Sequence, residues 1–258
     1  MRDTLLLAAE AGGRVLMEKF ASGVTVAYKG AIDLVTEADL AAEQAIVAIL
    51  RERHPHHDIL AEEGDYGCRG ADQRWVVDPL DGTTNFAHGF PWFAVSIALE
   101  VRGEVVLGAV YNPHNREQFV AERGLGATLN GRRLQVSNTA VLERALLATG
   151  FAYDHKLNPH NNYAHFEAFQ RQAQAVRRAG VASLDLACVA AGRFDGFWEL
   201  KLKPWDVAAG VLLVTEAGGL VSDYAGEPMP LDRGEILASN GHLHAAMQRV
   251  LGQGGRNG

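Results

Sequence analysis

The residues best suited to chemistry lie in a short segment that begins as a β-strand. Trp75–Val77 is an apolar run of the kind found inside a sheet. Asp78 ends this run with a carboxylate, and Pro79, which has no N–H to donate, is predicted to stop the strand. Asp81 follows, and two carboxylates on a rigid strand end suit a hard divalent cation such as Mg²⁺, which prefers oxygen ligands. The backbone carbonyl of Leu80 can add to such a ligand set.

The residues after Asp81 add groups that can hold an anion. Gly82 permits a tight turn, and Thr83 and Thr84 carry hydroxyls. If a helix begins after Gly82, its first backbone N–H groups can face a phosphate. A strand followed by Asp-x-x-Asp-Gly is also ordinary turn chemistry. This spacing alone therefore leaves a turn and a combined metal and phosphate site as open alternatives.

Longer stretches of the chain carry a resemblance to a known family. The string Asp78–Phe86 resembles the signature of the inositol monophosphatase family, and Trp205–Gly210 with Thr215–Gly219 resembles a second family stretch. Glu62–Gly64 lies upstream, where that family places its metal-binding glutamate. The resemblance runs from about Asp33 to Gly219. The sequences of three short segments most resemble the bacterial SuhB-type branch of the family: Arg177–Gly180, Leu184–Ala187 and Leu202–Asp206.

Carboxylates from these separate motifs each fall at a strand end or a helix start. Clustering them without a counter-charge would be costly, and a pair of divalent cations would remove that cost. The resemblance implies that Glu62, Asp78 and the Leu80 carbonyl bind a first Mg²⁺. It implies that Asp78, Asp81 and Asp206 bind a second, and that a weaker third ion binds near Glu62. Paired ions of this kind stabilise an in-line displacement at phosphorus.

The resemblance also assigns roles around the metals. Glu62 and Thr83 are expected to orient and deprotonate the attacking water, while the N–H groups of Gly82 and Thr83 hold the phosphate. The polyol side falls on Asp81, on Glu199 and on the backbone of Ala182. The predicted catalytic residues are Glu62, Asp81 and Thr83, and the predicted substrate contacts are Asp81, Gly82, Thr83, Ala182, Glu199 and Asp206.

Several of these residues have simpler readings when taken alone. Asp206 alone would be the N-cap of a helix that begins at Val207. Glu199 alone would be a solvated charge at a strand end, and Lys29, which matches a mobile-loop lysine of the family, would be a surface lysine. The role of Glu63 stays open, outside the metal set. The segment His54–His57 is interpreted as a solvated turn, because it lacks helical His spacing.

The length, charge and cysteine content of the chain exclude some classes of protein. The chain has 258 residues, 48% of them hydrophobic, which is enough for a sizeable core. Its formal net charge of −7 argues against binding nucleic acid through bulk positive charge. Two cysteines provide no disulfide framework and favour a reducing cytoplasm. The start of the chain shows no signal-peptide pattern, and no run approaches the length of a membrane span.

Hydrophobic periodicity predicts an α+β protein with helices and strands that alternate, with hairpins between some strands. The predicted helices are 3–20, 37–53, 161–175, 183–191, 205–217 and 242–251. The predicted strands are 24–28, 58–61, 75–77, 93–101, 104–111, 118–121, 127–129, 146–149, 194–200 and 220–222. One domain over 1–258 is expected, with possible halves 1–140 and 141–251 and a disordered tail 252–258. The resemblance implies the specific architecture, a layered α-β-α-β-α sandwich.

The acidic motif and the resemblance together predict a Mg²⁺-dependent phosphomonoesterase. The resemblance implies that it hydrolyses myo-inositol 1-phosphate or a similar polyol phosphate and that it is sensitive to Li⁺. Alternative substrates are fructose 1,6-bisphosphate, 3′-phosphoadenosine 5′-phosphate and histidinol phosphate. An alternative of another class is an accessory binding role in transcription antitermination, since SuhB-like proteins take part in such complexes. The family suggests a homodimer.

Overall fold

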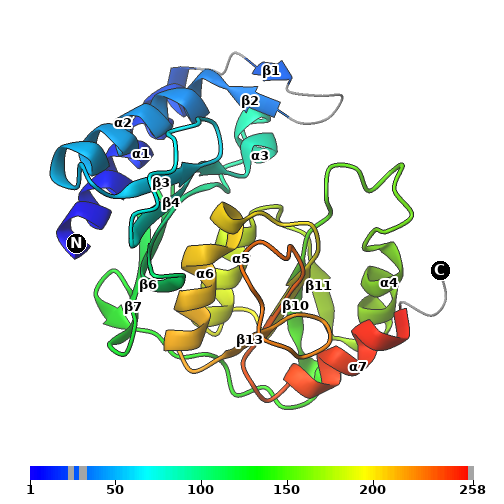
Figure 1. Cartoon of the computed structure of the whole chain (residues 1–258). Coiled ribbons are helices and arrows are strands. Elements are labelled where there is room, and N and C mark those ends of the chain that lie inside the picture. Colours follow the sequence, from blue (N-terminus) through cyan, green and yellow to red (C-terminus); the bar gives the residue numbers. More distant parts are fainter. Residues whose placement is uncertain (23–25, 29–33, 255–258) are drawn as a thin grey trace.

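Two large β-sheets organise the computed structural model, which describes residues 1–22, 26–28 and 34–254 (Figure 1). The seven-stranded sheet has the order β3-β4-β5-β6-β7-β8-β9. Its strands are Asp58–Ala61, Gln73–Asp81, Ala94–Val101, Glu104–Asn112, Glu117–Glu122, Gly126–Leu129 and Arg132–Arg133. The five-stranded sheet has the order β11-β10-β12-β14-β13, with strands Leu146–Thr149 (β10), Ala175–Arg177 (β11), Gly196–Glu199 (β12), Leu220–Ser222 (β13) and Ile236–Ser239 (β14). A separate pair is formed by β1 (Val26–Tyr28) and β2 (Leu34–Thr36).

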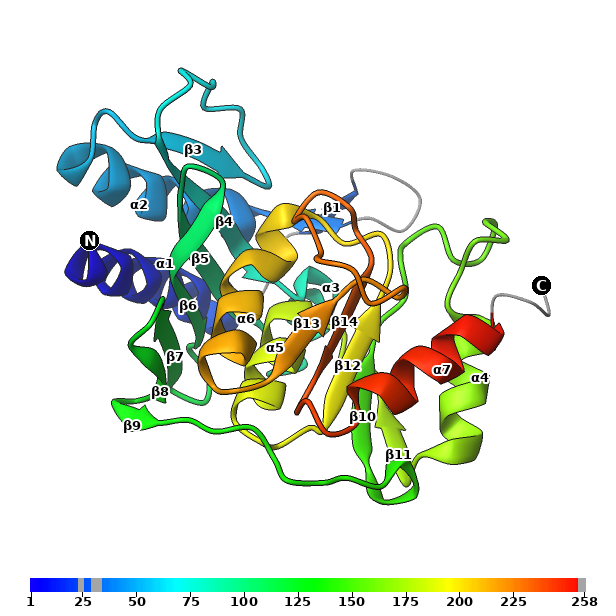
Figure 2. The same cartoon turned by 60° about the horizontal axis from the view of Figure 1, so that its bottom comes forward.

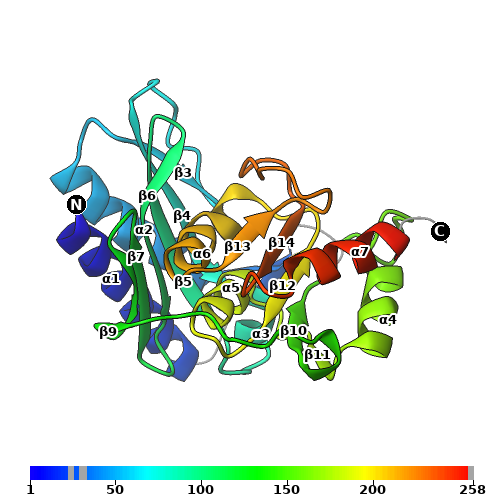
Figure 3. The ribbon, with the colours of Figure 1, turned by 90° about the horizontal axis from the view of Figure 1, so that it is seen from below.

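Helices cover both sheets and fill the space between them. The helices are α1 (Arg2–Ser22), α2 (Glu37–Arg53), α3 (Thr83–Ala87), α4 (Tyr163–Gln172), α5 (Ala182–Ala190), α6 (Pro204–Glu216) and α7 (His244–Gly254), with a 3₁₀ turn η1 at Leu142–Arg144. Figures 2 and 3 show α1 and α2 on the outer face of the seven-stranded sheet and α4 and α7 on the outer face of the five-stranded sheet, with α5 and α6 between the sheets. This confirms the predicted layered α-β-α-β-α architecture.

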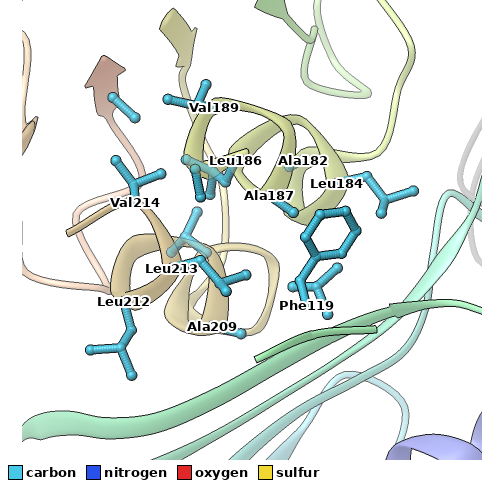
Figure 4. Packing of buried hydrophobic residues seen from close by; sticks show 14 of the residues in the cluster. Phe119, Ala182, Leu184, Leu186, Ala187, Val189, Ala209, Leu212, Leu213 and Val214 are labelled. Carbon is cyan, nitrogen blue, oxygen red and sulfur yellow. The ribbon is translucent and has the colours of Figure 1, made fainter. Parts of the chain in front are cut away.

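Each layer boundary is an apolar cluster. One cluster joins α1 and α2 to the seven-stranded sheet, and another joins α4 and α7 to the five-stranded sheet. The largest surrounds α5 and α6, where side chains of both helices meet Phe119 of β7 (Figure 4). The labelled residues of this packing are Phe119, Ala182, Leu184, Leu186, Ala187, Val189, Ala209, Leu212, Leu213 and Val214. The central helices are therefore buried on nearly all sides, and they fix the two sheets relative to each other.

Close packing between the elements of this central layer depends on two glycines. A Cβ at Gly108 of β6 would lie 2.9 Å from the backbone Cα of Ala209 on α6. A Cβ at Gly210 would lie 2.5 Å from Cδ1 of Leu186 on α5. Because protein interiors are close-packed, neither position has room for a methyl group without movement of its neighbours.

Strand β4 runs further than the sequence predicted. It continues through Pro79 to Asp81, with β3 parallel on one side and β5 antiparallel on the other. The prediction that Pro79 ends the strand is therefore wrong. Pairing with β5 shifts register between Asp78 and Asp81, so the irregularity accommodates the missing N–H of Pro79 while the strand resumes beyond it. The acidic strand end consequently extends over both aspartates.

Most other predicted elements agree with the structure. Helix α2 and the strands β3 and β13 have the predicted bounds, and hairpins join β5 to β6 and β8 to β9 through Arg102–Gly103 and Asn130–Gly131, whose φ angles are positive. The strands β2, β9, β11 and β14 were not predicted, and α4 ends at Gln172 where a longer helix was expected. Helix α7 continues to Gly254, inside the segment predicted as a tail. Residues 24 and 25 of the predicted strand 24–28, the loop 29–33 with Lys29, and residues 255–258 lie outside the described residues.

Within the described ranges, every helix is too short or too polar to cross a lipid bilayer.

The segment His54–His57, predicted to be a solvated turn, is partly packed. The rings of His54 and His57 stack 4.8 Å apart, and the His54 ring lies 5.7 Å from that of Trp75. The turn is confirmed, and Pro55 and His56 are exposed as expected. His54 and His57 are half-buried because Trp75, fully buried on β4, provides an apolar face for both rings.

The close contact at Gly108 leads to a stability prediction. The substitution Gly108→Ala is expected to lower the free energy of unfolding by about 1–3 kcal/mol, because overpacking forces β6 and α6 apart. Gly252→Ala on α7 is the matched control, since a Cβ there meets no atom within 4 Å. The control should leave stability unchanged or raise it by up to about 1 kcal/mol, because alanine favours a helix. Urea unfolding of both variants measures the difference, and equal stabilities would contradict it.

Candidate active site

A single cavity of about 350 Å³ collects every residue that the sequence singled out for chemistry. It opens where the end of β4 meets the starts of α3, α5 and α6 and the end of β12. The predicted residues that line it are Glu62, Asp78, Leu80, Asp81, Gly82, Thr83, Ala182, Glu199 and Asp206. Residues up to 144 positions apart in the chain are thus brought to one place by the two sheets and the helices between them.

Glu62 and Asp78 are brought together by strand pairing. The N–H of Glu62 donates to the carbonyl of Val77 at 3.2 Å, which extends the parallel pairing of β3 and β4 by one residue. Asp78, the next residue on β4, is 1% exposed, and its Oδ1 accepts the N–H of Leu80 at 3.0 Å. The two carboxylates therefore lie at adjacent strand ends, with one of them held by its own turn.

Asp81 connects the end of β4 to helix α5. Its Oδ2 accepts the backbone N–H of Ser183 at 2.7 Å, which brings Ala182 and the first turn of α5 to the cavity. Gly82 follows with φ 96°, and a Cβ there would lie 2.7 Å from Cγ2 of Val181. Both the backbone angle and the contact require glycine at this position.

Helix α3 begins at Thr83, directly after Gly82, as the anion-binding interpretation requires. The hydroxyl of Thr83 lies 3.2 Å from Oδ1 of Asp39 and 3.1 Å from the carbonyl of Leu80. Asp39 lies on α2 and is fully buried. Asp39 was not predicted as a site residue, because an acidic residue in the first turn of a helix is common on grounds of the helix dipole alone.

Asp206 lies in the first turn of α6. That helix begins at Pro204, so the alternative of Asp206 as the N-cap of a helix from Val207 is wrong. Oδ2 of Asp206 instead accepts the backbone N–H of Lys203 at 2.6 Å, the reciprocal half of a capping box. The carboxylate is thereby turned back toward the residues that precede the helix, where the cavity lies.

Glu199 ends β12 and is 8% exposed, so the alternative of a solvated charge is wrong. It pairs with Ile236 of β14, the strand that the sequence did not predict. The chain then turns at Lys201, whose φ is 66°, and enters α6 at Pro204. This short connection carries Glu199 and Asp206 into the same cavity from two different layers.

Burial dominates the electrostatics of these acids and outweighs the opposing charges of Arg178 on Glu199 and of Lys203 on Asp206. Burial, followed by the charges of Glu62, Asp81 and Asp206, raises the pKa of Asp78 well above its usual value. Burial raises the pKa of Asp81 to about 6, and burial with the charge of Asp81 raises the pKa of Asp206 to about 7. Burial with the charges of Asp206 and Asp81 raises the pKa of Glu199 to about 8. Each acid therefore resists ionisation unless a cation enters.

The donor set fits a hard cation better than any alternative. Asp78, Asp81 and Asp206 each use one oxygen on a backbone N–H, so the second oxygen of each can turn to a ligand. In the described part of the chain, the His, Cys, Asp and Glu side chains as they stand do not already form a closed group of three that could hold a metal. Oxygen donors of this kind, in excess negative charge, are those that Mg²⁺ binds.

Other groups line the cavity that the sequence analysis did not single out. They include Phe151, Tyr153, Arg178, Lys201 and Lys203. Lys201 pairs with Asp154 at 2.8 Å, which ties the segment after β10 to the turn after β12. The only sequence signal for the two lysines is their place in the string around Trp205 and Asp206. Glu63 is not among the lining residues; its N–H donates to Oε2 of Glu43 at 2.9 Å.

Comparisons with known proteins identify the family. The model of the inositol monophosphatase family matches residues 1–254. The Nus factor SuhB of Pseudomonas aeruginosa is 50% identical over 258 residues, covering 97% of this chain and 95% of that protein. The inositol-1-monophosphatase of Synechocystis sp. is 50% identical over 220 residues, covering 85% and 77%.

Solved structures agree with the sequence relatives. The extragenic suppressor protein suhB from Bartonella henselae has a TM-score of 0.91 and 43% identity, covering 97% of each chain. The inositol monophosphatase from Anabaena has a TM-score of 0.89 and 45% identity, covering 97% of this chain and 94% of that one. The resemblance drawn from the motifs is confirmed, and the chain belongs to the inositol monophosphatase family.

Proposed function

We propose that the chain is a Mg²⁺-dependent phosphomonoesterase that hydrolyses myo-inositol 1-phosphate or a similar polyol phosphate. The observation that carries the proposal is the convergence of Glu62, Asp78, Asp81 and Asp206 on one cavity beside the start of α3. Buried acids that repel one another are expensive to maintain, and a function that needs cations explains their retention. Relatives called inositol-1-monophosphatase support the choice of substrate.

In this proposal the chain supplies ligands, orientation and proton acceptance. Glu62, Asp78 and the Leu80 carbonyl hold a first cation. Asp78, Asp81 and Asp206 hold a second. Bound Mg²⁺ supplies charge stabilisation at the phosphoryl group and acidifies water. Glu62 and the Thr83 hydroxyl would orient the attacking water. The proton of the water would pass to the Glu62 carboxylate or, through the Thr83 hydroxyl, to Asp39, whose Oδ1 lies 3.2 Å from that hydroxyl.

The phosphate and the alcohol occupy different sides of the cavity. Backbone N–H groups of Gly82 and Thr83 precede the hydrogen bonds of α3 and are proposed to bind phosphate oxygens. Asp81, the backbone of Ala182 and Glu199 are proposed to contact hydroxyl groups of the polyol. Asp206, a proposed metal ligand, would also contact the substrate.

A phosphate-release panel tests the proposed substrate. It includes myo-inositol 1-phosphate, fructose 1,6-bisphosphate, 3′-phosphoadenosine 5′-phosphate and histidinol phosphate, each with Mg²⁺ and with excess EDTA. The highest kcat/KM is expected for the inositol phosphate, with loss of activity in EDTA and inhibition by Li⁺. Full activity in EDTA would refute the metal site, and a higher kcat/KM for another substrate would reassign the specificity.

A second candidate role is as a binding partner in transcription antitermination. Relatives called Nus factor SuhB favour it, because the one from P. aeruginosa matches nearly the whole chain. Affinity capture with the wild type and with Asp81→Asn separates the roles, since asparagine can still accept the Ser183 N–H while the proposed metal set loses a charge. Capture of the same transcription proteins by both would support a role independent of catalysis. The homodimer stays a prediction.

The raised pKa values predict how cation binding depends on pH. A carboxylate whose folded pKa is raised contributes stability below its ordinary pKa, and that contribution is lost as the pH rises through the folded value. The folded pKa values of Asp81, Asp206 and Glu199 are about 6, 7 and 8, so this loss of stability continues up to about those pH values. Mg²⁺ at about a hundred times its Kd should then raise Tm by about 5–10 °C at high pH. The gain should shrink at about pH 5.5, where protons compete for the same oxygens.

Differential scanning fluorimetry with and without Mg²⁺ at both pH values measures this gain, with K⁺ at equal ionic strength as the control. His54 and His57, whose pKa values are lowered by burial, also change the stability of the fold with pH. Their contribution to Tm is the same with and without Mg²⁺, so the difference between the two Tm values reports on the acidic site alone. An equal gain at both pH values would contradict the prediction.

Asp206→Asn should separate the two roles of that residue. Asparagine can still accept the Lys203 N–H, so the fold should persist, and loss of a repelling charge should leave the metal-free Tm unchanged or higher at alkaline pH. Loss of a ligand should lower kcat by more than the roughly 10–100-fold typical of residues that only support ligands. Steady-state kinetics and thermal melts are the measurements. A variant that unfolds but keeps its specific activity would show that capping is the main role.

Glu199→Gln should weaken the preference for phosphate esters whose alcohol carries neighbouring hydroxyl groups. Glutamine keeps the size of the side chain but accepts hydrogen bonds less strongly, and a hydrogen bond to a charged group is worth about 1.5–3 kcal/mol. KM for myo-inositol 1-phosphate should rise about tenfold, with a smaller change for p-nitrophenyl phosphate, which lacks neighbouring hydroxyls. Kinetics on both substrates decide this. Equal losses would mean that Glu199 supports the metal site or the fold.

A further inference from the structure

Gly150 and Glu199 are in contact across the boundary between two parallel strands. Gly150 follows β10, Glu199 ends β12, and both line the cavity. A Cβ built on Gly150 would overlap Cδ and both carboxylate oxygens of Glu199, and these are its three nearest atoms. The carboxylate therefore occupies the space that a side chain at position 150 would need.

The backbone beside this contact is held by a buried hydrogen-bond network. Thr149 faces Trp198 in the pairing of β10 with β12, and its hydroxyl donates to the Trp198 carbonyl at 2.6 Å. Nδ2 of Asn162 lies 2.7 Å from the Gly150 carbonyl and 2.7 Å from the Thr149 hydroxyl, and its Oδ1 accepts the Trp198 indole N–H at 2.8 Å. Thr149, Asn162 and Trp198 are each 1% exposed or less. Because the strand ends are joined in this way, an added Cβ would move the Glu199 carboxylate rather than the backbone.

Glycine at position 150 is not required by the backbone angle. Gly82 and Gly180, which line the same cavity, have φ angles of 96° and 78°, where a side chain is strained. Gly150 does not fall in that left-handed region. Alanine can therefore adopt the same backbone, and only the missing side chain distinguishes glycine here.

We infer that Gly150 is a positioning residue for Glu199, and that its missing side chain sets the place of the carboxylate that reads hydroxyl groups of the substrate. This inference rests on the proposed function and deepens it. The substrate class it selects is a phosphate monoester whose alcohol carries hydroxyls next to the ester. A methyl group at position 150 displaces the carboxylate into the space where those hydroxyls bind, and it leaves the ligands on β4 and α6 in place.

The test is a double-mutant cycle of Gly150→Ala, Glu199→Asp and the double variant. Aspartate is shorter by one methylene, so it removes the overlap. Gly150→Ala should raise the ratio of KM for myo-inositol 1-phosphate to KM for p-nitrophenyl phosphate about tenfold. In the Glu199→Asp background the same change should have a much smaller effect, because contacting residues are not additive. Additive effects, or equal losses on both substrates, would overturn the inference.

Melting temperatures of the four proteins provide a readout that needs no substrate. Gly150→Ala should lower Tm, and Glu199→Asp should recover part of that loss in the double variant. If Gly150→Ala fails to fold and the double variant fails as well, the overlap lies elsewhere and the inference is wrong. Failure of the wild type to hydrolyse polyol phosphates, with the Tm cycle as expected, would refute the proposed substrate but keep Gly150 as the residue that positions Glu199. Gly252→Ala is the control for a glycine-to-alanine change outside the cavity.

Discussion

Mutual repulsion among buried carboxylates is the constraint on which the rest of this molecule depends. The pKa of Asp78 is raised by its own burial and then by the charges of three other acids, that of Asp81 is raised by burial, and that of Asp206 is raised by burial and then by the charge of Asp81. Such a cluster is stable only if each carboxylate is held in place by the fold. Single backbone N–H groups from Leu80, Ser183 and Lys203 do this, each in a different loop or helix start.

The packing explains how the fold withstands that repulsion. Helices α5 and α6 carry Ser183 and Asp206 and are surrounded by the largest apolar cluster, with close packing at Gly108 and Gly210. Moving either helix away from β4 would relieve the repulsion, but it would open this apolar cluster. Deletion of buried contacts costs several kcal/mol per large side chain. The acids are therefore kept together by the apolar layer behind them rather than by attraction within the site.

What the sequence could predict follows from this division. Local signals predicted the strand that carries Asp78, the turn at Gly82 and the helix that carries Asp206, because each depends on residues within a few positions. Strand β14, by contrast, is a four-residue buried run whose identity as a strand comes from its partners β12 and β13. Asp39 and Gly150 act through residues 44 and 49 positions away, and a single sequence shows no trace of such pairs. Pro79 was misjudged because the register shift after Asp78 lets the strand continue.

The two sheets contribute different parts of the cavity, and this has a consequence for specificity. The acids Glu62, Asp78 and Asp81 come from the seven-stranded sheet, whereas Gly150 and Glu199 come from the five-stranded sheet. In the proposed function the first group binds the cations that act at phosphorus, with Asp81 also contacting the polyol, and Glu199, positioned by Gly150, contacts the polyol from the second sheet. The two groups stand on separately hydrogen-bonded sheets. A substitution at the ends of β10 or β12 can therefore change which alcohol the site prefers without moving the metal ligands on β4. Relatives that share the acidic motif can therefore differ in substrate through this second sheet alone, since specificity needs only a difference in the contacts made beyond the reacting group.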